Sequence, residues 1–171
     1  DANFEGSIIK NVDFSYANLE DVSFRFSDID KTSFKNANLE KADISRAVLI
    51  KVDFSNANLN NTKMFGSIWS ELNLKNTIMT NMDLQVIWGN ASFDKTILRD
   101  SDLSYTQLSP LIRITESDSY AQIISCNLTN SDLSNVVLYF TEFVACTLDG
   151  VDLSTTDFRS DNKFVGSSLR N

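Results

Sequence analysis

The stretch that decides the fold is residues 14–39, FSYANLEDVSFRFSDIDKTSFKNANL. Within it a large apolar residue returns at every fifth position, beginning with Phe14, Leu19 and Phe24. An α-helix repeats its apolar residues every three or four positions and a half-buried strand every two, so neither explains this pattern. Period five predicts a chain that makes one short side, turns and repeats. Each side would then send one large and one small residue inward.

The same period runs through almost the whole chain. It continues from Phe4 to Leu84, resumes at Trp88 with one residue missing, and holds to Leu108. Beyond an interruption it returns at Ile123 and reaches the last residues with one insertion. Because the centres on both sides of the interruption are apolar, the chain is expected to form one continuous repeat domain, residues 1–171.

Four tripeptides carry a family resemblance. They resemble the A(D/N)LXX motif of the pentapeptide repeat proteins, and are Ala17-Asn18-Leu19, Ala37-Asn38-Leu39, Ala57-Asn58-Leu59 and Ser131-Asp132-Leu133. The resemblance implies an all-β fold, a right-handed quadrilateral parallel β-helix with four pentapeptides per coil and about eight coils. The residues support four sides independently, since identical tripeptides and phenylalanines recur twenty positions apart. Stacked one rung apart, they would form asparagine ladders and aromatic stacks.

The four sides can be named from the first coil. We call them faces A, B, C and D, after their central residues Phe4, Ile9, Phe14 and Leu19. If the missing residue after Leu84 preserves face order, Trp88 lies on face B above Trp69, and both are expected to fill the core. Counting onward, Cys126 and Cys146 occupy the small inward slot of face B, where we expect reduced thiols.

One interruption of the period is serious. In Ser109–Tyr120, charged residues fall where apolar centres are due, and a charge cannot lie unpaired in such a core. The proline there also lacks the amide donor that a buried strand needs. We expect a loop or bulge that replaces faces C and D of one coil. It is either a tolerated insertion or a recognition loop, whose candidate residues are Pro110, Arg113, Glu116 and Asp118.

Composition argues against catalysis and nucleic-acid binding. With 15 basic and 23 acidic residues the net charge is −8, which repels nucleic acid, and histidine is absent. No P-loop, GxSxG, HExxH or GxGxxG motif occurs. We therefore expect a protein that is not an enzyme, with no cofactor, no metal and no membrane association. The expected location is cytoplasmic, or secreted or lumenal after processing.

Two surface features are candidates for binding. Face B carries apolar residues in the slot that is polar elsewhere, and the candidate interaction surface is Ile8, Val48, Ile50, Ile68 and Ile87. The alternative is scattered exposed apolar residues. The later coils are acidic, with no lysine or arginine between Arg113 and Arg159, and the candidate acidic surface is Asp132, Glu142, Asp149, Asp152 and Asp157. Ordinary solubility charge is the alternative there.

These features leave three hypotheses for function. The first is a non-catalytic rod that presents flat faces to a protein partner of unknown identity. The second rests on the resemblance, since some pentapeptide repeat proteins are acidic rods that bind DNA gyrase by mimicking DNA and protect against quinolones. The third is a β-helical domain of a larger secreted bacterial effector. Self-association through an exposed terminal coil is a further expectation.

Overall fold

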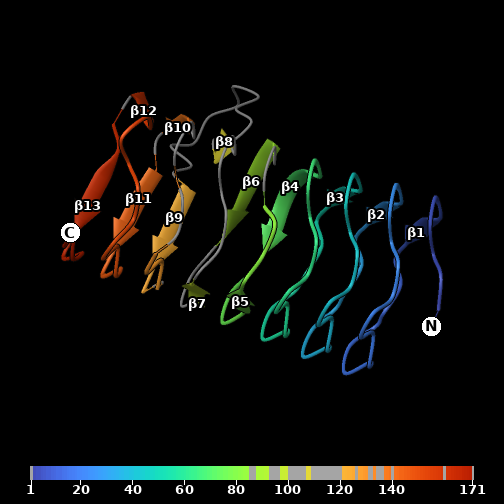
Figure 1. The fold of residues 1–171 in the computed structure, drawn as a ribbon. Helices are drawn as coiled ribbons and strands as arrows, with labels where there is room; N and C mark the ends of the chain where they lie inside the picture. Colours follow the sequence, from blue (N-terminus) through green and yellow to red (C-terminus); the bar gives the residue numbers. More distant parts are fainter. Residues whose placement is uncertain are drawn as a thin grey trace.

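The chain winds into a stack of similar coils that runs from the N-terminus to the C-terminus (Figure 1). The computed structural model describes residues 2–84, 88–92, 97–99, 107–108, 121–125, 127–130, 133, 137–139, 141–159 and 161–170. Within these residues there are short strands and no helix. The strands are β1 Ile8–Lys10, β2 Asp28–Asp30, β3 Val48–Ile50, β4 Ile68–Asn73, β5 Ile78–Thr80, β6 Trp88–Ser92, β7 Ile97–Arg99, β8 Gln107–Leu108, β9 Ala121–Ile124, β10 Val137–Tyr139, β11 Thr141–Val144, β12 Asp157–Arg159 and β13 Lys163–Val165.

The largest sheet is parallel and joins strands from successive coils. It has eight strands, in the order β1-β2-β3-β4-β6-β8-β10-β12. Ile29 pairs with Ile9 below it and Leu49 above it, so neighbouring strands of the first coils are twenty residues apart. Smaller sheets, β13-β11-β9 and β5-β7, lie on other sides. The predicted all-β parallel β-helix is confirmed.

The remaining three sides of the early coils are joined by isolated parallel bridges, again at a spacing of twenty. One bridge from each of faces A, C and D illustrates this: Ser23 with Asp43, Ser33 with Asp53, and Asn38 with Asn58. Together with the strands of face B, these bridges give four sides to each regular coil. The quadrilateral prediction is therefore confirmed for this part of the chain.

Turns without glycine or proline explain how so few turn-forming residues suffice. The residue two places after a centre has a positive φ, as in Asn11 at 55° and Tyr16 at 64°. At the corners that follow faces A, C and D, the amide one place further donates to the carbonyl of the centre, as from Ala17 to Phe14 at 3.1 Å. This is the geometry of a type II turn, in which the third residue is left-handed.

The motif's aspartate and asparagine cap these turns. Asp13 Oδ1 accepts a hydrogen bond from the Ser15 amide at 2.9 Å, and Asp53 Oδ1 accepts one from the Ser55 amide at 2.9 Å. The hydrogen bonds from Ser15 lower the pKa of Asp13. Partial burial would raise the pKa of Asp53, but hydrogen bonds from Ser55 and Lys35 hold it below the ordinary value. The acidic slot is thus structural, because its carboxylates stabilise the local backbone.

The interior is filled by stacked side chains from successive coils. Phe34 is fully buried, with its ring centroid 5.2 Å from that of Phe14 and 5.1 Å from that of Phe54. On face D, Asn38 Nδ2 donates to Asn18 Oδ1 at 3.1 Å, and Asn58 continues the ladder at 3.0 Å. The predicted aromatic stacks and asparagine ladder are both present.

The first correction concerns the missing residue near Trp88. Trp88 pairs with Ile68, and Gly89 pairs with Trp69. The prediction that Trp88 lies directly above Trp69 is therefore wrong by one position, although both residues belong to the same sheet. The register shifts between Trp69 and Leu72, where β4 and β6 continue from face B onto face C. The missing residue therefore falls at the corner between faces B and C, whereas the sequence suggested the corner between faces A and B.

The second correction concerns the coil that contains residues 109–120. Leu108 pairs with Leu138, thirty residues later, and Leu138 pairs with Phe158. Leu138 and Phe158 therefore lie on face B, where face D was expected. Ile123 in β9 lies fifteen residues, or three sides, before Leu138, and Phe143 in β11 lies five residues, or one side, after it. Both strands therefore belong to face C, where they pair with each other and β9 lies beside β6. The coil has ten extra residues instead of losing two sides, and the buried Cys146 moves from face B to face D.

This register makes a testable prediction about the ten extra residues. Deleting residues 110–119 would place Ser109 directly before Tyr120 and restore five positions between Leu108 and Ile123. We expect the variant to fold with a free energy of unfolding within about 1 kcal/mol of wild type, because shortening a loop changes closure entropy little. Urea denaturation followed by circular dichroism measures this. If the segment supplied two sides of a coil, the deletion would be strongly destabilising.

Candidate protein-binding surface on face B

The strands of face B alternate between core and solvent. In β1 to β4 the inward residues Ile9, Ile29, Leu49 and Trp69 are buried. Their neighbours point outward, because successive side chains of a strand lie on opposite faces. The outward side chains include Ile8 at 72% exposure, Ile68 at 46% and Ile50 at 39%. The apolar residues of the predicted interaction surface that fall in described strands therefore do lie on one side of the solenoid.

Only some of them are neighbours. Val48 pairs directly with Ile68 across β3 and β4, and Ile50 lies two positions along β3 from Val48. We call Val48, Ile50 and Ile68 the face-B cluster. Ile8 is separated from it by β2, whose outward Asp28 pairs with both Ile8 and Val48. Ile87 lies outside the described residues.

Trp88 takes the register position that the sequence assigned to Ile87. It pairs with Ile68 in the next strand, so its backbone holds the register position that follows Val48 and Ile68. The sequence could not reveal this, because the one-residue deletion can be placed at either of two neighbouring corners without changing the number of apolar centres.

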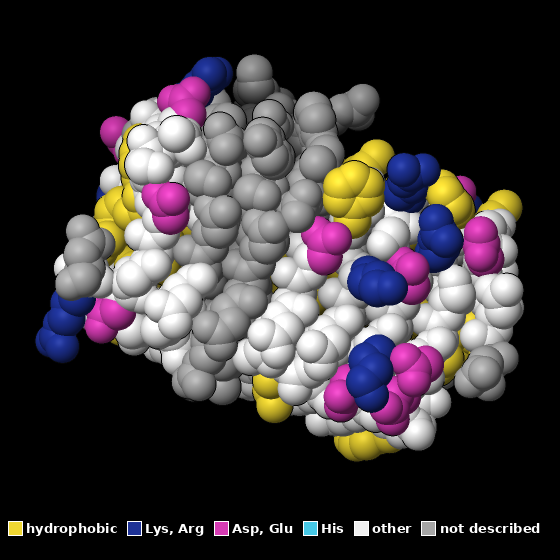
Figure 2. Space-filling view, viewed as in Figure 1, with side chains coloured by type: hydrophobic (Ala, Val, Ile, Leu, Met, Phe, Trp, Pro, Cys, Tyr) yellow, Lys and Arg dark blue, Asp and Glu magenta, His cyan; other side chains and the backbone are white. Residues whose placement is uncertain are grey.

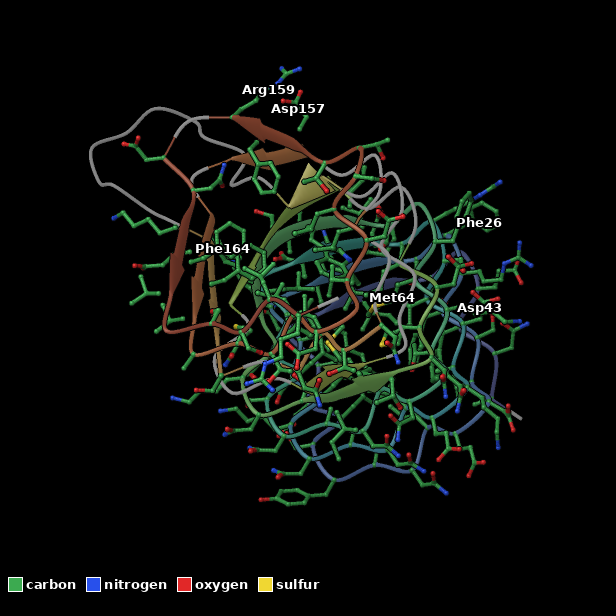
Figure 3. All side chains as sticks on the ribbon, turned by 60° about the vertical axis from the view of Figure 1, so that its left-hand side comes forward. Phe26, Asp43, Met64, Asp157, Arg159 and Phe164 are labelled. Carbon is green, nitrogen blue, oxygen red and sulfur yellow. The ribbon has the colours of Figure 1, made fainter. Side chains whose placement is uncertain are left out.

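An aromatic and cationic column borders the cluster at the corner between faces A and B. The Cζ atom of Arg25 lies 5.3 Å from the ring centroid of Phe26. Arg46 Cζ lies 5.5 Å from the same ring and 6.0 Å from the ring of Phe65. We call Arg25, Phe26, Arg46 and Phe65 the corner column. Figure 3 shows Phe26 on the outer edge, on the same side as Asp43, whereas the buried Met64 lies inside the solenoid.

Sequence reasoning missed this column. Phe26 and Arg46 are twenty positions apart, which stacks them one rung from each other, and Gly66 continues the series. All three have a positive φ, between 55° and 67°. The twenty-residue period could therefore have predicted this column at the turn positions. The apolar centres of the repeat predict only which residues fill the core.

The opposite border of face B is also cationic. Lys31 and Lys51 occupy successive turn positions there, and Lys51 Nζ lies 3.6 Å from Glu71 Oε1. Basic, acidic and hydrophobic side chains are interspersed on the half of the molecule built by the first coils (Figure 2). The face-B cluster is thus an apolar patch between two rows that contain cations.

The candidate acidic residues do not gather on one face. Glu142 lies in β11 opposite Lys163, whereas Asp157 Oδ2 forms a 2.6 Å ion pair with Arg159 in β12 of face B. Asp149 Oδ1 accepts a hydrogen bond from Ser168 at 2.7 Å. Hydrogen bonds from Ser154 lower the pKa of Asp152, which caps its own turn. Asp132 lies outside the described residues.

The candidate loop cannot be placed in the same way. Pro110, Arg113, Glu116 and Asp118 all lie outside the described residues. Among the residues that the structure describes, no three histidine, cysteine or acidic side chains are grouped so as to hold a metal ion. In that same part of the chain, no helix has the length and apolar character needed to cross a membrane.

Comparison with solved structures finds pentapeptide repeat proteins at low sequence identity. HetL, a pentapeptide repeat protein involved in heterocyst differentiation regulation in the cyanobacterium Nostoc, is 16% identical, with a TM-score of 0.35 over 99% of this chain and 85% of HetL. QnrB1, a plasmid-mediated fluoroquinolone resistance protein, is 17% identical, with a TM-score of 0.42 over 100% of this chain and 88% of QnrB1. A pentapeptide repeat protein of the Arabidopsis thaliana thylakoid lumen is 26% identical over 59% of this chain and 68% of its own, with a TM-score of 0.30.

The family assignment comes from the sequence itself. No curated protein matches the chain at the level of sequence. The family described as Pentapeptide repeats (8 copies) matches residues 1–36, 27–64 and 119–159. The unmatched residues 65–118 include the coil shortened after Gly89 and the start of the coil that has ten extra residues. The matches cover most of the sequence, and the chain belongs to the pentapeptide repeat family.

Proposed function

We propose that this protein is a non-catalytic interaction module that binds a protein partner through face B. The observation that carries the proposal is the face-B cluster, in which Val48, Ile50 and Ile68 lie outward on two paired strands. Clustered exposed apolar side chains on a soluble surface mark contact sites more often than single ones do.

The scaffold under the cluster suits this role. Leu49 and Trp69, the inward neighbours, are buried, and both strands are paired on each side. A partner would therefore meet a surface that is already ordered, and little conformational entropy would be lost on binding. Burying the exposed part of such side chains contributes up to about 1–2 kcal/mol each, at roughly 25 cal/mol per Å² of apolar area.

The test compares two lysine substitutions of similar isoleucines. Ile68 on face B is 46% exposed, and Ile78 in β5 on face D is 42% exposed. Proteins from the native source that bind immobilised wild-type protein and the I78K variant, but not the I68K variant, are face-B partners. For such a partner, purified, we expect I68K to raise Kd by about 30-fold or more, the size of an interface hot spot, and I78K to leave it nearly unchanged.

Equal binding by wild type, I68K and I78K would reject face B as the contact surface. Circular dichroism spectra and urea midpoints of the three proteins provide the control for folding. Because both substitutions are at outward positions, we expect these midpoints to agree closely.

DNA mimicry toward gyrase receives less support from the arrangement of charge. A mimic of DNA needs acidic groups along one surface, whereas Glu142, Asp152 and Asp157 lie on three different faces. Asp157 is also paired with Arg159. A gyrase supercoiling assay at micromolar protein discriminates the two functions, since a face-B interaction module leaves supercoiling unchanged.

A further inference from the structure

We propose that Arg46 anchors a carboxylate of the partner, so that face B selects a protein segment in which an acidic residue adjoins large apolar ones. This rests on the proposed function of face B and specifies the chemistry of its ligand. The apolar side chains of the segment would pack on Val48, Ile50 and Ile68. Its carboxylate would meet the guanidinium of Arg46 at the adjoining corner.

The aromatic neighbours of Arg46 leave its hydrogen-bond donors available. The Cζ atom of Arg46 lies 5.5 Å from the ring centroid of Phe26 and 6.0 Å from that of Phe65. Such contacts attract the charge of the guanidinium to the ring and supply no hydrogen-bond acceptor in the plane of its N–H groups. The N–H groups point outward in the plane of the guanidinium, where they form a fork that matches the two oxygens of a carboxylate.

The ion pairs of the neighbouring cations distinguish them from Arg46. Its corner neighbour Arg25 has its Nε atom 3.8 Å from Asp43 Oδ2. Two nearby lysines also form ion pairs, with 3.0 Å between Lys41 Nζ and Glu20 Oε1 and 3.6 Å between Lys51 Nζ and Glu71 Oε1. In the described part of the chain, by contrast, no carboxylate lies within ion-pair distance of Arg46, which is exposed. An exposed arginine next to two aromatic rings, with no carboxylate partner among the described residues, can pair with an external anion.

The position of Arg46 links this anion site to the apolar cluster. Arg46 precedes the outward Val48 by two residues, and Phe65 precedes the outward Ile68 by three. The corner column and the face-B cluster are therefore continuous along the same two rungs. A ligand that satisfies both must carry a carboxylate close to apolar side chains, as an acidic–apolar peptide does. Single-stranded nucleic acid would also stack on such a column. Its backbone carries one phosphate per nucleotide, however, so a net charge of −8 opposes it more strongly than it opposes a peptide with a single carboxylate.

The experiment selects peptides from a random displayed library with wild-type protein and measures the affinities of the enriched peptides for five proteins. These are wild type, Arg46→Gln, Arg46→Lys, Ile68→Lys and the control Lys63→Gln, which removes an exposed cation from face A. We expect wild type to enrich aspartate or glutamate beside large apolar residues. Arg46→Gln should weaken the best acidic peptide about tenfold or more, the size of a charge-assisted pair. Arg46→Lys should restore part of the affinity, and Lys63→Gln should change little.

A second peptide, with glutamine in place of the acidic residue, separates the two claims. Wild type and Arg46→Gln should bind this peptide equally. Enrichment that depends on Ile68 but shows no acidic preference and no effect of Arg46 would overturn the carboxylate anchor and leave face-B binding intact. No enrichment that depends on Ile68 would overturn both. Tight binding of a single-stranded oligonucleotide that is lost in Arg46→Gln would assign the column to nucleic acid instead and overturn the proposal.

Discussion

Replacing Phe34 by alanine is expected to lower the free energy of unfolding by about 3–5 kcal/mol, the usual range for a buried phenylalanine. Phe34 is fully buried and lies in a stack between Phe14 and Phe54, and its ring centroid is 5.6 Å from that of Phe24 in a T-shaped arrangement. The substitution thus removes contacts with the coils below and above at once. Since each coil of a solenoid contacts only its neighbours, a cavity here weakens the coupling along the rod.

Urea denaturation followed by circular dichroism measures this loss. Tyr16→Ala is the matched control, because Tyr16 is 78% exposed and its loss should change stability by less than about 0.5 kcal/mol. Equal effects of the two substitutions would contradict the stacked aromatic interior.

Replacing Leu49 by lysine is expected to cost at least about 4 kcal/mol and to leave much of the protein unfolded. Leu49 is fully buried beneath the face-B cluster, between Ile29 and Trp69 in the adjacent coils. An ammonium group there would have no partner among apolar side chains, and burial of an unpaired charge is among the most destabilising changes known. The loss is comparable with the total stability of an ordinary domain.

The neighbouring residue supplies the control for this prediction. Ile50 follows Leu49 directly but points outward and is 39% exposed, so Ile50→Lys should fold with nearly unchanged stability. Thermal unfolding of both variants measures the contrast. A Leu49→Lys variant of normal stability, or an Ile50→Lys variant that does not fold, would contradict the assignment of Leu49 as inward and Ile50 as outward. Either result would remove the basis for the binding surface.

Most of the fold was predictable because one physical constraint is repeated along the chain. Each side needs one large buried residue, and every coil places it in contact with the same position of the next, as Phe14, Phe34 and Phe54 illustrate. The turn positions repeat with the same period, and side chains as different as Tyr16 and Lys31 adopt a positive φ there. Period and spacing therefore identify the sides, the stacks and the ladder without further information.

The register beyond each irregularity could not be predicted from the period. A deletion can be absorbed at any nearby corner, and for that reason the register positions of Ile87 and Trp88 were predicted one residue out. The coil that contains residues 109–120 is harder still. Extra residues in multiples of five conserve the spacing of the centres while moving every later centre to another face, as for Leu138. Only the pairing of strands distinguishes these arrangements.

The candidate site was predictable in part for the same reasons. The outward isoleucines of β3 and β4 follow from the alternation within a strand, and they lie together as expected. The corner column of Arg46 and its two rings depends on side-chain directions at left-handed turn residues, which the period does not specify. The candidate acidic residues were grouped by sequence, whereas the solenoid distributes them around its sides.

The central claim is that face B is the surface that meets a protein partner. Its most direct test places a photoreactive benzoylphenylalanine at position 68 or at position 78 and irradiates the protein in its native cells. Both sites are outward and similarly exposed, on faces B and D. We predict a discrete cross-linked product from position 68, absent from position 78 and lost when Ile50→Lys is added. Cross-linking from position 78 alone, or from neither position, would contradict the account.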